Sequence, residues 1–199
     1  MPVKTKVERE RKMGKITVET CGIEGLKVIT PQVFGDARGY FMETYQYNDY
    51  KEAGIDEIFV QDNQSASKRG VLRGLHFQKE FPQGKLVRVI KGEVFDVAVD
   101  LRAGSPTFGK WYGIVLSEEN KKQFFVPKHF AHGFLVLSEY AEFCYKCTDF
   151  YHPGDEGGLM WNDADIKVDW PLQEGVELIL SERDTKWGSF SEYTKNMAD

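Results

Sequence analysis

Hydrophobic and polar residues alternate in short runs along most of this chain, and residues that favour turns separate the runs. The runs are rich in Val, Ile, Phe and Tyr, and such alternation is typical of β-strands, whose side chains point in turn to opposite faces. Pro, Gly, Asn and Asp between the runs indicate turns. We expect strands at residues 16–20, 26–30, 38–45, 71–78, 84–92, 93–101, 110–117, 123–127, 131–138 and 141–151.

Helical patterns are scarce. Residues 48–54 predict one or two helical turns ending at Gly54, and a short helix is expected after Ser181, where the sequence SERD could cap it. Many short strands separated by turns favour an all-β antiparallel sandwich or barrel. We find no repeat or linker, so residues 16–199 are expected to form a single domain. Residues 1–15 carry six Lys or Arg and two Glu, and they predict a polar, solvated arm.

The faces of one predicted strand differ in polarity. In residues 93–101, Asp96 and Asp100 share one face, whereas Phe95, Val97 and Val99 share the other. The acidic face could lie in solvent, or it could line a wet cavity inside a barrel that binds a polar ligand. The pattern alone leaves both interpretations open.

Two further strands carry side chains capable of chemistry. Strict alternation would place Arg73 and His76 on opposite faces, but Gly74 lies between them, and a glycine inside a strand often marks a bulge. A bulge would let both side chains point the same way. In residues 141–151, Phe143 and Tyr145 share a face of mixed polarity, which ordinary amphipathic tyrosines would also produce.

Composition narrows the class of protein. The 199 residues include 31 acidic and 26 basic side chains, a balance that argues against a nucleic-acid partner but allows a local site for an anion. The three cysteines (Cys21, Cys144 and Cys147) favour neither a disulfide framework nor a zinc ribbon, which points to the cytoplasm. No apolar run approaches the ~18 residues of a membrane span, and the charged start is unlike a secretory signal. Dinucleotide and P-loop motifs are missing.

Seven ordered motifs together resemble one family. They are GDARGYFMETY (35–45), QDNQSAS (61–67), VLRGLHFQ (71–78), QGKLVRVIKGEVFDVAVDLR (83–102), VPKHFAHGFLVLSE (126–139), YKCTDFYHPGDEGG (145–158) and the closing DWPL with LSERD (169–172 and 180–184). In this order they resemble the dTDP-4-dehydrorhamnose 3,5-epimerases, from about Ile16 to about Lys186. The resemblance implies a cupin-type jelly-roll (a double-stranded β-helix) and a homodimer that exchanges N-terminal strands.

The resemblance also implies a reaction. The substrate would be dTDP-4-dehydro-6-deoxy-D-glucose and the product dTDP-4-dehydro-L-rhamnose, an intermediate of dTDP-L-rhamnose biosynthesis. C3 and C5 flank the C4 ketone, so a base can remove either proton and leave an enolate, and an acid can return a proton to the opposite face. Neither a metal nor a redox cofactor is required.

The resemblance assigns roles to individual residues. It makes His76 the base, Asp184 the carboxylate that orients it, Lys85 the cation beside the C4 oxyanion and Tyr145 the acid. The residues implied in substrate binding are Arg38, Glu43, Gln61, Asn63, Arg73, His132, Tyr151, Glu156 and Arg183. Two positions depart from the family pattern, since His129 stands where Gly is usual and Arg183 where Lys is common. His76 is followed by Phe77 and Gln78 rather than by a second histidine, which favours a site without metal.

Three alternatives remain beside the double epimerase. An enzyme that inverts only C3 or only C5 would use the same residues. A jelly-roll that merely binds a nucleotide sugar would need no base or acid. A metal-dependent cupin would need clustered histidines. Deuterium uptake, a His76 variant and metal analysis, respectively, would distinguish them.

Overall fold

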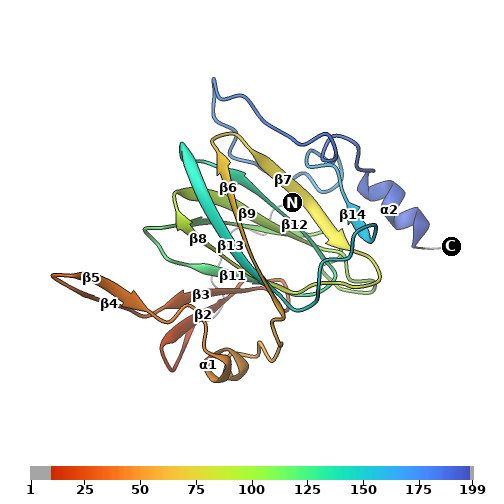
Figure 1. The fold of residues 1–199 in the computed structure, drawn as a ribbon. Helices are drawn as coiled ribbons and strands as arrows, with labels where there is room; N and C mark the ends of the chain where they lie inside the picture. The colour runs from red at the N-terminus through yellow and green to blue at the C-terminus, as the bar shows by residue number, and fades with distance from the viewer. Residues whose placement is uncertain (1–9, 198–199) are drawn as a thin grey trace.

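Two β-sheets stacked face to face form the body of the protein in a computed structural model that describes residues 10–197 (Figure 1). One sheet has seven strands in the order β1-β2-β3-β11-β8-β13-β6, and the other has five in the order β10-β9-β12-β7-β14. The strands are β1 (Glu10–Met13), β2 (Ile16–Thr20), β3 (Lys27–Pro31), β4 (Val33–Asp36), β5 (Gly39–Met42), β6 (Gln61–Lys68), β7 (Leu72–Gln78), β8 (Lys85–Lys91), β9 (Glu93–Asp100), β10 (Trp111–Ser117), β11 (Gln123–Val126), β12 (Phe130–Val136), β13 (Tyr140–Cys147) and β14 (Glu156–Gly158). The predicted all-β jelly-roll is confirmed.

Strands β4 and β5 pair with each other as a hairpin that extends away from the two sheets (Figure 1). Its side chains are exposed along nearly their whole length, although several are aromatic or aliphatic. Among the described residues, the hairpin joins neither of the two larger sheets. It therefore presents apolar surface that the rest of the chain does not cover.

Two short helices complete the described structure. Helix α1 (Tyr47–Glu52) lies where one was predicted, and the side chain of Gln46 caps its start. The helix predicted after Ser181 is wrong, because the chain there forms turns and helix α2 (Phe190–Asn196) begins only after Ser189. The Ser181 hydroxyl does receive the backbone N–H of Asp184, as a cap would, but the same hydroxyl also donates to the Asp184 carboxylate. The Ser181 hydroxyl therefore fixes the Asp184 carboxylate within a turn and does not start a helix.

Part of the predicted polar arm is ordered as a strand. Residues 10–13 form β1, which pairs antiparallel with β2 at the edge of the larger sheet. Charged side chains on an edge strand discourage pairing with further strands, which explains why the segment is so polar. Residues 1–9 lie outside the described structure.

The hydrophobic core has two main layers, one on each side of the five-stranded sheet. Between the sheets, Val94 and Ala98 of β9 pack with Phe124 and other buried side chains. On the outer face of the same sheet, Val97 packs under Trp170, which belongs to the loop-rich C-terminal segment. Strand β9 is therefore buried on both faces. Asp96 points into the sandwich, and the buried carboxylate of Asp100 is held by Arg102, Ser105 and Thr107. The solvated interpretation of that face is wrong.

A bulge at Gly74 shapes the wall of the sandwich. His132 of β12 lies opposite His76, and Phe134 lies opposite Arg73, so β7 contains one extra residue between the two pairs. A Cβ atom on Gly74 would lie 2.5 Å from the backbone of Gly133, which makes glycine necessary here. The predicted break in alternation is confirmed, and it places Arg73 and His76 on the same side of the strand.

Candidate active site

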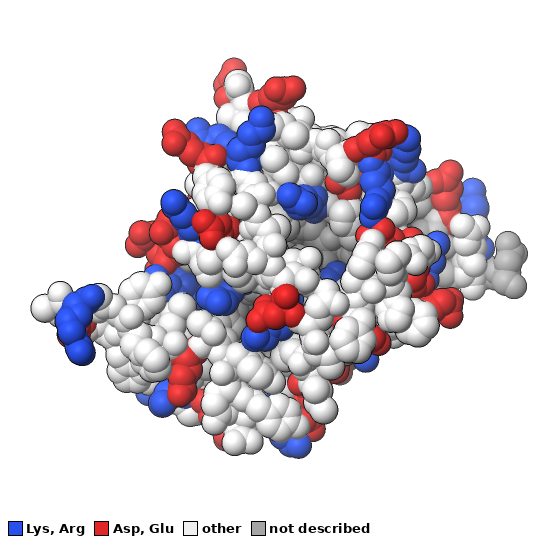
Figure 2. All heavy atoms as spheres, in the orientation of Figure 1, with Lys and Arg blue, Asp and Glu red and all other residues white. Residues whose placement is uncertain are grey.

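A cavity of about 1000 Å³ opens between the two sheets and is closed on one side by the loop at residues 179–186. Figure 2 shows the face that carries this hollow, with Lys and Arg side chains around it. Eight of the residues singled out from the sequence line it: Arg73, His76, Lys85, His132, Tyr145, Glu156, Arg183 and Asp184. They come from both sheets and from the C-terminal loop, so only the folded chain brings them together.

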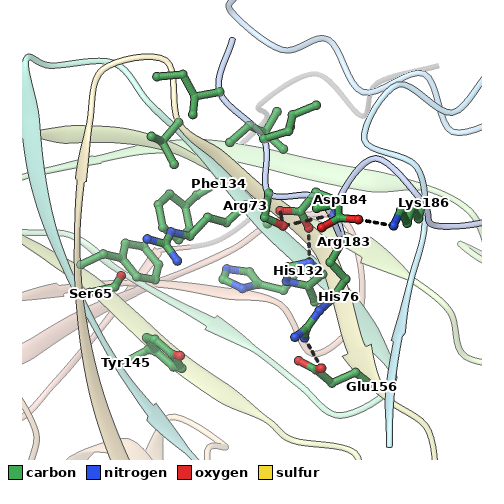
Figure 3. A pocket seen from close by; sticks show the side chains of 18 of the residues that line it. Ser65, Arg73, His76, His132, Phe134, Tyr145, Glu156, Arg183, Asp184 and Lys186 are labelled. Atoms are coloured by element: carbon green, nitrogen blue, oxygen red, sulfur yellow. Dashed lines mark hydrogen bonds and ion pairs between the residues drawn. The ribbon is translucent and has the colours of Figure 1, made fainter. Parts of the chain in front are cut away.

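His76 and Asp184 form a close pair at this cavity. The Nε2 atom of His76 lies 2.5 Å from the Oδ1 atom of Asp184, although the two residues are 108 positions apart in sequence (Figure 3). Burial would raise the pKa of Asp184, but hydrogen bonds from His76 and Ser181 outweigh it and hold this pKa below its usual value. An ionised carboxylate accepts a hydrogen bond, so Nε2 of His76 carries the hydrogen, and in the neutral imidazole Nδ1 then keeps its lone pair. Within residues 10–197, Nδ1 has no hydrogen-bond partner.

A second histidine–carboxylate pair lies deeper in the sandwich. The Nε2 atom of His132 lies 2.9 and 3.0 Å from the two carboxylate oxygens of Asp96. Asp96 is completely buried, and burial raises its pKa while the charges of His132 and Lys85 act in the opposite direction. The ring of His132 also stacks on Phe143. His132 is therefore fixed in orientation, with the imidazole at the cavity wall.

Lys85 lies at the start of β8 and contributes an ammonium group to the cavity. Burial lowers the pKa of Lys85, and the nearby Asp96 and Glu156 oppose that change. Over the described part of the chain, no carboxylate oxygen lies within 4 Å of its Nζ atom. A cation in such surroundings attracts a negative charge that arrives with a ligand or develops during a reaction.

Tyr145 faces the cavity from β13, in the sheet opposite to the one that carries His76 (Figure 3). Burial raises the pKa of its phenol, so the group is protonated at neutral pH. Arg73 lies near it, and the Ser67 hydroxyl holds the Arg73 guanidinium at 3.2 and 3.0 Å. The imidazole of His76 and the protonated phenol of Tyr145 thus face the same cavity from opposite sheets.

Glu156 and Arg183 form an ion pair beside the His76–Asp184 pair. Glu156 belongs to β14 and Arg183 to the C-terminal loop, so the pair links that loop to the five-stranded sheet (Figure 3). Arg183 stands where the family pattern favours Lys, and its guanidinium still supplies the cation for this contact.

Arg38 and Glu43, which were expected to bind substrate, lie outside this cavity. Arg38 is at the turn of the β4–β5 hairpin and pairs with Asp36, and Glu43 follows the hairpin and pairs with Lys15. The hairpin extends away from the sheets, so neither side chain reaches the cavity of its own chain. Arg38 and Glu43 could therefore bind substrate only at the cavity of another subunit.

Gln61, Asn63 and Tyr151 are grouped with one another but do not line the cavity either. The Gln61 side chain donates to Asn63 at 3.1 Å and accepts from the backbone of Tyr151 at 2.9 Å. The ring of Tyr151 is exposed. The three residues therefore form a polar and aromatic surface beside the ends of β6 and β13.

Several residues of the site were missed by sequence reasoning. Ser65, Phe134, Ser181 and Lys186 line the cavity, and Asp96 supports His132 from behind the wall. The alternation of side chains along β9 predicts that Asp96 lies on a face that could line a cavity. Nothing in the sequence indicates that its carboxylate contacts His132. For Ser181, the sequence predicts only a helix cap.

No group of three or more His, Cys, Asp or Glu side chains in residues 10–197 is placed to hold a metal ion. The absence of a metal in the reaction stays a prediction. In the same part of the chain, no helix is long and apolar enough to cross a membrane.

Comparison with known proteins shows the family to which the chain belongs. The family model for dTDP-4-dehydrorhamnose 3,5-epimerase matches residues 20–192. A dTDP-4-dehydrorhamnose 3,5-epimerase from Pseudomonas aeruginosa is 58% identical over 163 residues, which cover 81% of this chain and 89% of that protein.

Two solved structures show the same fold. A dTDP-6-deoxy-D-glucose-3,5-epimerase from Legionella pneumophila, in complex with dTDP-4-keto-L-rhamnose, has 52% identity and a TM-score of 0.86, covering 88% of this chain and 93% of that one. A 3′-monoepimerase from Streptomyces bikiniensis, in complex with dTDP-quinovose, has 31% identity and a TM-score of 0.82, covering 88% and 89%.

The jelly-roll fold, the cavity and these matches define an epimerase of nucleotide-linked sugars. The chain belongs to the dTDP-4-dehydrorhamnose 3,5-epimerase family. The 3,5-epimerase function expected from the sequence is thereby confirmed, and so is the class of nucleotide-sugar substrate.

Proposed function

We propose that His76 is the base that removes the protons at C3 and C5 of dTDP-4-dehydro-6-deoxy-D-glucose, and that Asp184 orients it. The observation that carries this proposal is the 2.5 Å contact between the two side chains at the cavity wall. The contact fixes the tautomer with Nδ1 free to accept a proton, and the ionised Asp184 stabilises the imidazolium that forms.

Lys85 stabilises the enolate. When a proton leaves C3 or C5, the electron pair moves toward the C4 oxygen, and that oxygen becomes negative. The Lys85 ammonium has no carboxylate partner within 4 Å among residues 10–197, so its charge is available to the oxyanion. Loss of such a donor commonly lowers the rate by about 10²- to 10³-fold.

Tyr145 returns the proton. It approaches from the sheet opposite to His76, so a proton from its phenol reaches the other face of the planar enolate and inverts the carbon. Each inversion leaves an imidazolium at position 76 and a phenolate at position 145. Exchange of one proton with water at each group restores both before the second carbon reacts. Arg73, His132, Glu156 and Arg183 bind the sugar and the diphosphate, for which arginine is well suited.

The assembly that we propose is a homodimer in which the β4–β5 hairpin packs on the partner subunit. Val33, Phe34, Tyr40 and Phe41 of the hairpin have exposed fractions between 41% and 63%, and a second copy would cover them. Arg38 and Glu43 would then serve the partner's cavity, while Gln61, Asn63 and Tyr151 would hold the nucleotide beside their own cavity.

The dimer has a direct test. Subunits with Arg38→Ala and subunits with His76→Ala should each be inactive, and mixing them should restore activity because one site in each hybrid is intact. A monomer in solution, or mixing without any recovery, would contradict the exchange.

The proposed place of action is the cytoplasm, where nucleotide sugars are made and thiols stay reduced. Cys21, Cys144 and Cys147 are all free thiols in the structure. No nucleic-acid partner and no cofactor are proposed.

The double epimerisation is tested by NMR in D₂O with dTDP-4-dehydro-6-deoxy-D-glucose. We expect deuterium at both C3 and C5, and reduction of the product should give the L-rhamnose configuration. Deuterium at C3 alone would favour the alternative of a single-site epimerase, for which the Streptomyces bikiniensis 3′-monoepimerase is a structural precedent.

A further inference from the structure

A second side chain of the C-terminal loop contacts His76. Trp187 follows Asp184 by three residues, and its ring packs against the His76 imidazole with 5.9 Å between the ring centroids and an angle of 66° between the planes. We propose that Trp187 is a positioning residue, which holds the imidazole so that its free nitrogen faces the substrate. This inference rests on the proposed role of His76 as the base.

The indole is seated on a glycine of the neighbouring strand. Gly158 of β14 lies directly opposite His76 of β7 in the sheet. A Cβ atom on Gly158 would lie 2.4 Å from Cδ2 and 2.5 Å from Cε2 of Trp187. Any larger residue at this position would displace the ring, so Gly158 is what allows the indole to approach the strand and reach the imidazole.

Packing and the adjacent backbone fix the indole. Its Nε1 atom is buried and has no hydrogen-bond partner in the described structure, so no polar contact of the ring sets its position. The chain directly after it is tethered, because Gly188 forms a bridge with Leu159 and its carbonyl accepts from the backbone N–H of Met160 at 3.0 Å. The ring is therefore held between a fixed loop and the strand.

The arrangement gives His76 two independent restraints. Asp184 fixes Nε2 by a hydrogen bond in which the ring can still pivot, and Trp187 limits that pivoting by packing on the imidazole. A base that is misplaced by even 1 Å can lose about 10²-fold in rate. Trp187 does not line the substrate cavity, so its loss should affect the chemical step and leave substrate binding intact.

The test compares variants of Trp187 by steady-state kinetics. Trp187→Leu, which keeps an apolar side chain but removes the aromatic ring, should lower kcat by about 10- to 100-fold with KM within about twofold. Trp187→Phe, which keeps a ring, should recover most of kcat. Trp161→Leu is the matched control, because Trp161 is also partly buried but packs against the core away from the cavity, and it should leave kcat unchanged. A wild-type kcat in Trp187→Leu would overturn the proposal.

A double-mutant cycle tests the seat of the indole. Gly158→Ala should lower kcat in the wild type, where it displaces Trp187, and should have little further effect in Trp187→Leu. If the fold-losses in kcat of the two single variants simply multiply in the double variant, the proposal is overturned. The His76→Asn variant separates this inference from the proposed function. An active His76→Asn enzyme would refute the role of the base itself, whereas an inactive one beside a fully active Trp187→Leu enzyme would refute only the role of Trp187.

Discussion

Two histidine–carboxylate pairs stand at the same cavity, and they differ in burial and in how they are built. The His76 and Asp184 side chains are 35% and 3% exposed, and the carboxylate comes from a loop after the last strand. The His132 and Asp96 side chains are 9% and 0% exposed, and both belong to neighbouring strands of one sheet. The His76–Asp184 pair is therefore accessible from the cavity, whereas the His132–Asp96 pair is part of the buried cavity wall.

The difference supports the proposal that His76 carries the proton and that His132 only contacts the substrate. A base needs a carboxylate that stays ionised and a ring nitrogen that can reach both substrate and solvent, and the low pKa of Asp184 meets the first need. Asp96 has its pKa raised by burial, and its partner His132 is enclosed by Phe143. The buried pair is thus suited to hold one orientation rather than to exchange protons in each turnover.

The largest expected effect separates the two histidines. His76→Asn should lower kcat by about 10³- to 10⁴-fold, because it removes the base. His132→Asn should cost much less in kcat and raise KM, because it removes only a contact. Steady-state kinetics with saturating substrate measures both, and an equal loss of kcat in the two variants would abolish the distinction.

The next effect concerns the two carboxylates. Asp184→Asn should lower kcat by about 10²- to 10³-fold, since the neutral amide no longer stabilises the imidazolium.

The Asp184→Asn substitution should also change how the free energy of unfolding depends on pH. The folded-state pKa of Asp184 is lowered, so its contribution is present above its unfolded value of about 3.9 and disappears as pH falls through the folded value. Urea unfolding should therefore show a deficit for the variant at pH 7 that shrinks toward pH 3, and a constant deficit would contradict the ionised pair.

Asp96→Asn should mainly reduce stability. The amide nitrogen of Asn has no acceptor to replace the contact that Asp96 makes with His132 Nε2, so buried polar groups lose their partners, and such changes cost about 1–3 kcal/mol in the free energy of unfolding. Chemical denaturation at pH 7 measures this loss. If Asp96→Asn were as stable as the wild type but as inactive as Asp184→Asn, the buried pair would be the catalytic one.

The smallest effect lies in the turn before His132. His129 has a φ of +64°, in the left-handed region that favours glycine. His129→Gly should leave kcat unchanged and raise the free energy of unfolding by up to about 1 kcal/mol, because the left-handed conformation costs glycine less. A clear loss of stability in thermal unfolding would show that the His129 side chain contributes more than its backbone strain costs.

Much of this site follows from sequence patterns. Alternation predicted the strands that carry Arg73, His76, Lys85 and Tyr145, and Gly74 signalled the bulge that turns the first two to the same side. The motif order suggested Asp184, but its contact with His76 depends on a loop that returns across the sheet from 108 residues away.

The remaining features depend on three-dimensional packing. Residues 61–68 are almost all polar, which does not predict a strand, and β6 is defined only by its pairing with β13. In the sequence, nothing distinguishes Trp187 from other aromatic residues in turn-rich segments, or Gly158 from other loop glycines. Only the contact between them connects both to His76.

The central claim is that base and acid act from opposite sheets, and Tyr145→Phe tests it most directly. In D₂O, this variant should still exchange the substrate protons through His76 but return deuterium without inversion, so NMR should show labelled substrate and little epimer. His76→Asn should show neither exchange nor epimer. Normal epimerisation by Tyr145→Phe, or loss of exchange as complete as in His76→Asn, would contradict the division of roles.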